Sequence, residues 1–279
     1  MNGHFVKMQG AGNDFILIDN RRGIWPLDAL HLRRWCDRRL GVGADQLLVL
    51  EETRRPDADF RYRIFNADGG EVEQCGNGAR CMTRWVLERI FPGECVRFET
   101  MCAVIRGSIG KDGLVSVEMG MPILEADDLP FRTDGLSYCG GAWRGFGLPG
   151  TDELCVLAVG NPHAVRFGPM PEDEVFRRTG ERLQDHPAFP EGINFECVCP
   201  RSDSEADFRV WERGVGETPA CGSGACAAAV AGMLTGRFGR TVTFHTRGGI
   251  LRVRRPDPDG PVFLEGPAEY VFEGDLPLD

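Results

Sequence analysis

The sequence predicts an α/β chain, in the broad sense that includes α+β folds, built from two similar halves. Short segments with strand-like alternation are interleaved with longer segments of helical pattern. A glycine-rich turn carrying a cysteine occurs twice, at Cys75 and at Cys221, and a helical segment follows each one. Polar residues also recur at matching distances before the two cysteines, as one internal duplication would produce.

The first half contains several strands and two helices. The strands are predicted from alternating apolar residues bounded by glycine or turn residues, and the helices from apolar spacing that stops at glycine or proline. The predicted strands are 5–8, 15–19, 46–51, 60–65, 95–100, 104–109 and 114–119, and the predicted helices are 27–39 and the segment from Cys75 to Pro92-Gly93.

The pattern begins again near Met121-Pro122, which we take as a domain boundary. We therefore expect one domain over residues 1–121 and a second over 122–268, with 269–279 as a tail. The second half is predicted to contain strands 154–159, 193–198, 208–212, 241–245, 250–253 and 262–265 and helices 172–184 and 225–234.

The distances to the two cysteines indicate where the copies match. An asparagine lies 62 residues before Cys75 and another lies 60 before Cys221, and later pairs keep this difference of two until the last polar residue, which lies 9 before each cysteine. The matching pairs are Asn13 with Asn161, Gln46 with Asn194, Phe60-Arg61 with Phe208-Arg209, and Asn66 with Glu212. We place the small insertion between the Phe-Arg pair and the last polar residue.

Composition excludes several classes of function. The 279 residues carry a formal net charge of −10, which argues against a nucleic-acid partner or an acidic membrane surface. No apolar run approaches a membrane span, and Met1-Asn2-Gly3-His4 does not resemble a signal peptide, so we expect a cytoplasmic protein. Eleven cysteines without any C-x-x-C spacing predict thiols rather than a zinc ribbon or a disulfide framework, and we expect no metal.

A cysteine at a helix start has chemical consequences. Free backbone amides there attract anions and lower the pKa of a thiol. Two such thiols on opposite sides of one carbon could remove a proton from one face and return one to the other, which is racemisation or epimerisation by two bases. Without a pyridoxal cofactor, the amides of both helix starts would have to stabilise the carbanion in a dry pocket.

A set of motifs in the same order resembles diaminopimelate epimerases over nearly the whole chain. The motifs are Gly10-Ala11-Gly12-Asn13-Asp14-Phe15, Gly41-Val42-Gly43-Ala44-Asp45-Gln46, Tyr62-Arg63-Ile64-Phe65-Asn66-Ala67-Asp68-Gly69, Gln74-Cys75-Gly76-Asn77-Gly78-Ala79-Arg80, Gly160-Asn161-Pro162-His163, Trp211-Glu212-Arg213-Gly214 and Ala220-Cys221-Gly222-Ser223-Gly224-Ala225. The resemblance implies interconversion of LL- and meso-2,6-diaminopimelate for lysine and peptidoglycan, with no cofactor. It also implies a homodimer, a mixed, mostly antiparallel sheet wrapped around a central helix in each domain, and a tail that returns to the first domain.

The resemblance also assigns roles to residues. Cys75 and Cys221 would be the acid/base pair, and His163 and Glu212 would tune the pKa values of their thiols. A forked donor suits a distal carboxylate, which is the role expected of Arg213. The substrate-binding set implied by the family is Asn13, Gln46, Asn66, Gly76, Asn77, Asn161, Asn194, Glu212, Arg213, Gly222 and Ser223.

Other interpretations remain open. A single cysteine in an apolar helix is usually an inert buried thiol, and only the repeated setting of Cys75 and Cys221 argues otherwise. A proline or hydroxyproline racemase would use the same pair of thiols but needs no forked donor such as Arg213. The pair could also be a redox site that forms a Cys75–Cys221 disulfide, or the chain could be a binding module that keeps the pocket without the chemistry.

Overall fold

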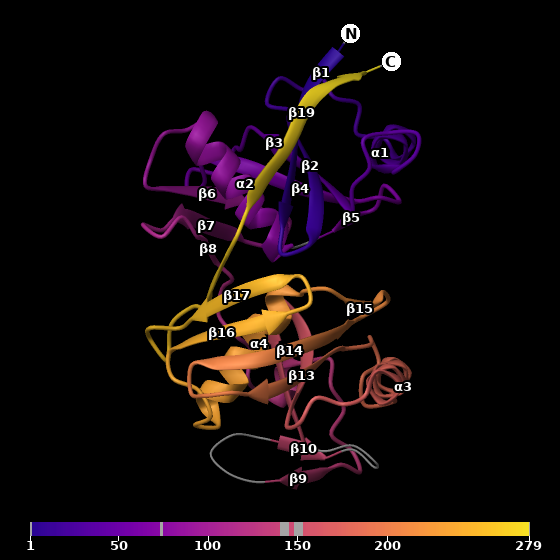
Figure 1. Ribbon diagram of the computed structural model, residues 1–279, viewed down its shortest axis with the longest axis vertical. Coiled ribbons are helices and arrows are strands. Elements are labelled where there is room, and N and C mark those ends of the chain that lie inside the picture. The colour runs from indigo at the N-terminus through magenta and orange to yellow at the C-terminus, as the bar shows by residue number, and fades with distance from the viewer. Residues whose placement is uncertain (1, 73–74, 140–144, 148–152, 279) are drawn as a thin grey trace. The chain divides into compact units, whose positions relative to one another are not determined.

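The computed structural model describes residues 2–72, 75–139, 145–147 and 153–278, so Gln74 of the first cysteine motif lies outside the described residues. The chain divides into two compact units (Figure 1). The first consists of Met1–Glu118 and Glu265–Asp279, and the second of Met119–Leu264. Each unit has a mixed sheet whose strands contact one buried helix, which confirms the predicted fold class.

The first unit joins the beginning of the chain to its end. In chain order its elements are β1 (Asn2–Gly10), β2 (Asn13–Asp19), α1 (Ala29–Cys36), β3 (Gln46–Glu51), β4 (Phe60–Asn66), β5 (Glu71–Val72), α2 (Gly76–Arg89), β6 (Cys95–Glu99), β7 (Val104–Ile109), β8 (Val115–Glu118) and β19 (Glu269–Pro277). The last strand, β19, pairs antiparallel with β1 and lies beside it in Figure 1.

The second unit follows without interruption. Its elements are η1 (Ala126–Asp128), β9 (Ser137–Cys139), β10 (Gly145–Gly147), β11 (Glu153–Val159), β12 (Asn161–Phe167), α3 (Asp173–Gln184), β13 (Asn194–Pro200), β14 (Glu205–Glu212), β15 (Gly216–Thr218), α4 (Gly222–Leu234), β16 (Thr241–Thr246), β17 (Gly249–Arg254) and β18 (Phe263–Gly266), which ends within the first unit.

The two units share one strand topology. In the first, α1 connects the parallel strands β2 and β3, β4 and β5 run antiparallel to their predecessors, and β4 is parallel to β6. In the second, α3 connects the parallel strands β12 and β13, and β14, β15 and β16 repeat the same relationships. This correspondence is what a duplicated α/β unit gives.

The structure corrects the position of the insertion between the copies. In the β3–β4 pair Leu50 lies opposite Tyr62, and in the β13–β14 pair Val198 lies opposite Phe208. Tyr62-Arg63, rather than Phe60-Arg61, therefore corresponds to Phe208-Arg209. The extra two residues lie in the loop before β4, and from there to the cysteines the copies match with a constant offset.

Both central helices are buried, for different local reasons. The helix α4 is rich in alanine and glycine and apolar on every side, so strands β11, β12, β13, β16 and β17 can contact it closely. The helix α2 contacts β1, β2, β3, β6, β7 and β8. At Gly107 of β7 an added Cβ would lie 2.0 Å from Oγ1 of Thr83, so this strand needs glycine to pack on the helix.

The peripheral helices cover a second core in each unit. Under α1 the core includes Trp25, Leu32 and Trp35, and under α3 it includes Phe176 and Phe195. The helix α1 is shorter than the predicted 27–39. Its N-cap is Asp28, which accepts hydrogen bonds from the amides of Leu30 and His31, and Asp37 has extended backbone angles that end the helix.

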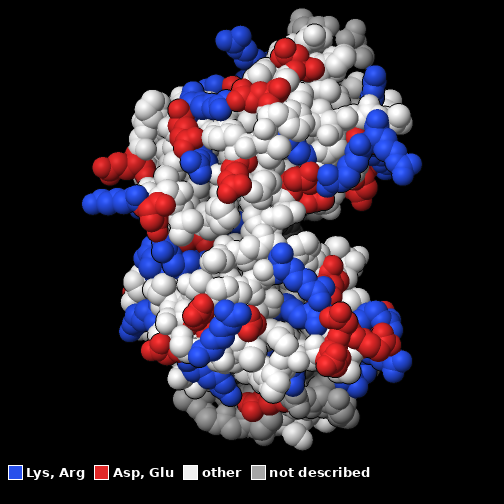
Figure 2. All heavy atoms as spheres, viewed as in Figure 1, with Lys and Arg blue, Asp and Glu red and all other residues white. Residues whose placement is uncertain are grey.

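Several short or irregular strands were not expected from the sequence. These are β5, β9, β10, β12, β15 and β19, together with the 3₁₀ turn η1. The strand β12 has Pro162 as its second residue, which weakens a strand pattern. On the face drawn in Figure 2, basic and acidic side chains are interspersed over both units.

Candidate active site

Cys75 and Cys221 occupy the same position in the two units. Each is the N-cap residue of the central helix, with extended backbone angles of φ −144° and ψ 106° at Cys75 and φ −125° and ψ 119° at Cys221. The next residues, Gly76 and Gly222, begin the helices, so each cysteine lies beside a first turn whose amides have no acceptor within the helix. The structure thus places both thiols at buried helix starts.

The Cys75 sulfur contacts both its own helix and the β1–β2 turn. The amide of Gly78 donates to Sγ at 3.4 Å, and the thiol itself donates to Oδ1 of Asn13 at 3.7 Å. Asn77 of the same turn is buried, and its Oδ1 has no hydrogen-bond partner among the residues that the structure describes. Asn13 and Asn77, both predicted as substrate-binding residues, therefore lie close to Cys75.

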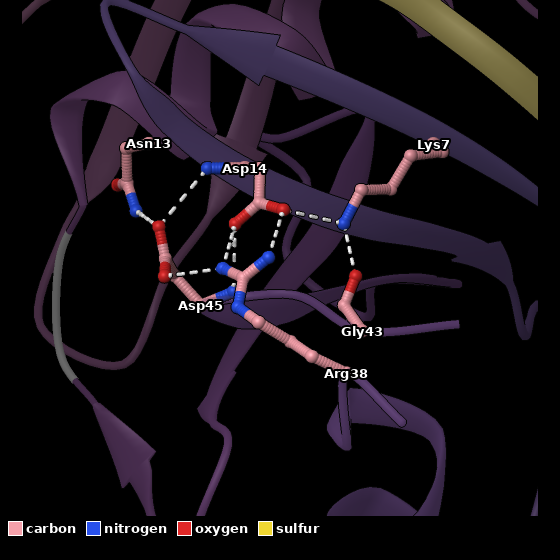
Figure 3. Close-up of polar contacts among 6 residues, drawn as sticks. All are labelled: Lys7, Asn13, Asp14, Arg38, Gly43 and Asp45. Atoms are coloured by element: carbon pink, nitrogen blue, oxygen red, sulfur yellow. Dashed lines mark hydrogen bonds and ion pairs between the residues drawn. The ribbon is translucent and has the colours of Figure 1, made fainter. Parts of the chain in front are cut away.

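A network of charged residues fixes the orientation of Asn13 (Figure 3). Nδ2 of Asn13 donates to Asp45 at 2.6 Å, and Asp45 also accepts from Arg38 at 2.8 Å. Arg38 forks onto Asp14 at 2.9 and 2.7 Å, and buried Lys7 donates to Asp14 at 2.7 Å and to the carbonyl of Gly43. The Asn13 amide is held by its nitrogen, which leaves its oxygen facing Cys75.

The network also sets the charge of Asp14. Burial alone would raise the pKa of the Asp14 carboxyl, but hydrogen bonds from Arg38 and Lys7 hold it well below its ordinary value. Asp14 therefore stays ionised over the whole working pH range of an ordinary enzyme, and it keeps both cations in place.

We expect Asp45→Ala to lower kcat/KM for the enzyme's reaction by about 10- to 100-fold, because the Asn13 amide loses the acceptor that orients it. The matched control is Asp57→Ala, which removes an exposed aspartate paired with Arg55 in the same unit. Steady-state kinetics of both variants test this. Equal activity of Asp45→Ala and the control would show that Asn13 does not need the network.

Gln46 and Asn66 form the second polar pair of the first unit. They lie opposite each other on β3 and β4, and Nε2 of Gln46 donates to Oδ1 of Asn66 at 2.9 Å. Oε1 of Gln46 is buried and has no hydrogen-bond partner within the described part of the chain. An unused buried acceptor suits a ligand that brings a donor, such as an ammonium group.

The pKa of the Cys221 thiol differs from the value that its position at a helix start would predict. Burial raises its pKa well above the ordinary value, and the carboxylates of Glu212 and Glu196 raise it further, against opposing hydrogen bonds from Ser223 and the amide of Gly224. Ser223 Oγ lies 3.4 Å from the sulfur. The expectation of a lowered pKa is therefore wrong at Cys221, because loss of hydration outweighs the helix amides, and this thiol is protonated at neutral pH.

Alkylation of Cys221 tests this electrostatic effect. We expect iodoacetamide to label Cys221 slowly at pH 7 and faster as pH rises, and Glu212→Gln to speed labelling at pH 7 by about three- to tenfold, since it removes a negative charge beside the thiolate. Peptide mass spectrometry gives the rate at this residue. The control is Glu172→Gln at the exposed start of α3, and equal rates in all three proteins would contradict the effect of Glu212.

A buried triad lies near this helix start. His163 and Glu196 are both fully buried, with Nδ1 of His163 2.7 Å from Oε1 of Glu196, and Nε2 lies 2.8 Å from Oδ1 of Asn161. Each ring nitrogen faces an oxygen that can accept a hydrogen bond, so the contacts with Glu196 on one side and Asn161 on the other fix the ring. His163 therefore positions Asn161, while the carboxylates are the groups that act on the Cys221 thiol.

Glu196 was not identified from the sequence, although a signal existed. It lies two residues after Asn194 on β13, and side chains two apart in a strand share a face. Its carboxylate also explains Gly224, where an added Cβ would lie 2.7 Å from Oε1 of Glu196. The sequence also did not identify four residues that support Asn13, namely Lys7, Asp14, Arg38 and Asp45. Two of them, Asp14 and Asp45, lie within the family motifs 10–15 and 41–46.

The remaining predicted residues surround the β13–β14 end. Nδ2 of Asn194 donates to the carbonyl of Pro162 at 3.0 Å, and its Oδ1 accepts from the amide of Arg213 at 2.9 Å. Glu212 accepts a hydrogen bond from Thr218, and NH1 of Arg213 donates to the carbonyl of Glu191 at 3.2 Å. The Arg213 guanidinium keeps other donors available for a carboxylate.

The structure shows no group of three or more His, Cys, Asp or Glu side chains suited to a metal, as far as residues 2–72, 75–139, 145–147 and 153–278 are concerned. Over the same residues, no helix is long and apolar enough to cross a membrane.

Solved structures share this two-unit fold. A PhzF-family phenazine biosynthesis protein from Bacillus anthracis has a TM-score of 0.65 at 14% identity, covering 99% of both chains. A hydroxyproline epimerase from Agrobacterium vitis has a TM-score of 0.66 at 14% identity, covering 99% of this chain and 91% of that one. At this identity the likeness defines the fold class alone, that of the PhzF and proline racemase proteins.

Sequence comparison narrows this class to one family. A family model described as diaminopimelate epimerase matches residues 5–125 and 155–271. The diaminopimelate epimerase of Azotobacter vinelandii is 44% identical over 278 residues, 98% of this chain and 99% of the relative, and that of Nitrosomonas europaea is 43% identical over 98% of both. The chain belongs to the diaminopimelate epimerase family, and it is an isomerase.

Proposed function

We propose that this epimerase interconverts LL- and meso-2,6-diaminopimelate, in the biosynthesis of lysine and peptidoglycan precursors, by a two-base mechanism without a cofactor. In one direction Cys75 removes the α-proton and Cys221 delivers a proton to the opposite face, and in the other direction the roles exchange. The observation that carries the proposal is the repeated cysteine N-cap, because each copy of the unit supplies one acid/base group at the same position.

The mechanism must overcome a large difference in acidity. An amino-acid α-proton has a pKa of ~20 or higher against about 8.5 for a thiol, a gap on the order of 16 kcal/mol. We propose that the amides of Gly76, Asn77, Gly222 and Ser223 hold the reacting carboxylate and the developing negative charge. Aligned amides at two helix starts, shielded from water, supply stabilisation of this kind without reorganisation during the reaction.

The polar residues around each thiol would hold the rest of the substrate. Arg213 would fork onto the distal carboxylate, and the buried acceptors of Asn77 and Gln46 could receive donors from an ammonium group. We assign the other contacts to Asn13, Asn66, Asn161, Asn194 and Glu212. Glu212 would tune the pKa of the Cys221 thiol directly, and His163 would do so through its contact with Glu196. A forked donor for a second carboxylate favours diaminopimelate over proline.

The organisation of the protein is part of the proposal. We propose an N-terminal domain over 1–121, joined by the tail 269–279, and a C-terminal domain over 122–268, each supplying one cysteine. The family resemblance supports a cytoplasmic homodimer, and light scattering of the purified protein checks the dimer.

Proton NMR in D2O tests the function. We expect the reduced protein, with LL-diaminopimelate and no added cofactor, to form the meso isomer with deuterium at the α-carbon. L-Proline under the same conditions should show no exchange. Exchange into proline alone would favour the racemase alternative, and no exchange into either substrate by folded, reduced protein would leave the thiol redox alternative.

A further inference from the structure

A forked ion pair joins β15, the strand just before Cys221, to the adjacent strand β14. Nε and NH2 of Arg209 on β14 donate to the two carboxylate oxygens of Glu217 on β15 at 2.9 and 3.0 Å. The guanidinium also lies 4.2 Å over the ring centre of Phe176, and its NH1 donates to the carbonyl of Pro171 at 3.0 Å. With 10% of its side chain exposed, Arg209 is held on all sides.

The first unit carries the same pair. Nε and NH2 of Arg63 on β4 donate to the carboxylate oxygens of Glu71 on β5, both at 2.7 Å. The Arg63 guanidinium lies 4.8 Å over the ring centre of Phe65, and NH1 lies 3.6 Å from Glu51. Hydrogen bonds from Arg63 hold the pKa of the Glu71 carboxyl below its ordinary value, so the pair is ionised at neutral pH.

The two pairs occupy equivalent positions. Ile64 lies opposite Val72 in the first unit, and Val210 lies opposite Thr218 in the second, so the hairpins have the same register. In both units the arginine lies eight residues before the glutamate and the glutamate lies four residues before the cysteine. The number of residues from arginine to cysteine is thus the same in both units. Among the residues that the structure describes, no other ion pair recurs at equivalent positions of the two repeats.

The strands that carry the glutamates need such an anchor. β5 has two residues and β15 has three, so their backbone ladders offer few hydrogen bonds. A planar guanidinium forked onto a carboxylate fixes distance and direction together, and it does so better where the pair is partly shielded from water. Because each glutamate lies only four residues before its cysteine, fixing the glutamate limits where the chain can place the N-cap residue.

We propose that Arg63–Glu71 and Arg209–Glu217 are paired positioning clamps, each of which sets the place of one acid/base thiol at its helix start. This rests on the proposed function, because a clamp matters for catalysis only if both thiols take part. The four residues are positioning residues, since they act through the cysteines.

The chain offers matched controls on the same strands. Arg97 forks onto Asp59, next to the first residue of β4, at 3.2 and 2.8 Å, and Arg201 forks onto Asp207 of β14 at 3.0 and 2.5 Å. These pairs lie at the ends of β4 and β14 away from the cysteine hairpins. If a forked pair merely stabilises a strand, Asp59→Asn and Asp207→Asn should lower activity as much as substitutions in the clamps do.

The experiment measures activity and the reactivity of each thiol in the full-length enzyme. We expect Glu71→Gln and Glu217→Gln to lower kcat/KM by about 10- to 100-fold, and the two controls by less than about twofold. Arg63→Lys and Arg209→Lys, which keep the charge but lose the fork, should reproduce the loss. Iodoacetamide labelling should change at Cys75 in the Glu71 variant alone and at Cys221 in the Glu217 variant alone.

The outcomes separate the two proposals. Unchanged activity in the clamp variants, or labelling that changes equally at both thiols, would overturn the clamps. Full activity in the lysine variants would also overturn them, because charge without the fork would then suffice. A wild-type enzyme that shows no epimerisation while the crossed labelling pattern persists would sink the proposed function and leave the positioning of the thiols standing.

Discussion

Cys75→Ser and Cys221→Ser should each lower kcat/KM for LL-diaminopimelate by about 10²- to 10⁴-fold, the range that one lost acid/base group costs. At position 75 serine keeps the N-cap hydrogen bond, since its hydroxyl can accept from the amide of Gly78 as the sulfur of Cys75 does. Serine is also a favoured N-cap residue at position 221. Its hydroxyl is far less acidic than a thiol, so proton transfer fails while the fold persists. Conversion of LL to meso substrate, followed by NMR, gives the rate.

Each serine variant should also show which face of the carbon its remaining thiol serves. We expect each variant to exchange the α-hydrogen of one stereoisomer with D2O without inverting it, and the two variants to prefer opposite isomers. The matched controls are Cys95→Ser and Cys199→Ser, which change half-buried cysteines on β6 of the first unit and β13 of the second. Full epimerisation by either Cys75→Ser or Cys221→Ser would contradict the two-base mechanism.

The sequence predicted the cysteine turns because their signature is local. Glycines around Cys75 and Cys221, followed by helical residues, leave few other structures for these segments. The position of the insertion was harder to predict. Residues 60–63 read Phe-Arg-Tyr-Arg, and a strand repeats every two residues, so a slip of two gives the same pattern of aromatic and basic side chains. Only the strand pairing decides between the alternatives.

The supporting residues could not be predicted because their partners are distant in sequence. Lys7, Arg38 and Asp45 meet only when the β1–β2 turn packs against the loop before β3. Glu196 pairs with His163, 33 residues earlier, because β12 and β13 run parallel. Burial raises the pKa of the Cys221 thiol because strands distant in sequence pack around α4. The residues next to Cys221 in the sequence do not reveal those strands.

The second large effect concerns Glu196. We expect Glu196→Ala to lower the free energy of unfolding by about 3–5 kcal/mol, because it removes one partner of a fully buried pair and leaves His163 without its acceptor. The control is Glu205→Ala, which removes the glutamate of the partly exposed His245–Glu205 pair in the same unit and should cost about 0–1 kcal/mol. Urea unfolding measures both, and equal losses would contradict the buried pair.

The pH dependence of this effect has a definite sign. Burial raises the pKa of the Glu196 carboxyl, and the opposing attraction of His163 does not reverse the shift. Folding then favours the protonated carboxyl, so its contribution to stability is complete below the ordinary pKa of 4.5 and is lost as pH rises through the higher folded value. Glu196→Gln removes this titration. The unfolding free energy of wild type minus that of Glu196→Gln should therefore fall as pH rises from 4.5 to 8. A rise in this signed difference over the same range would mean that the fold stabilises the carboxylate as an anion.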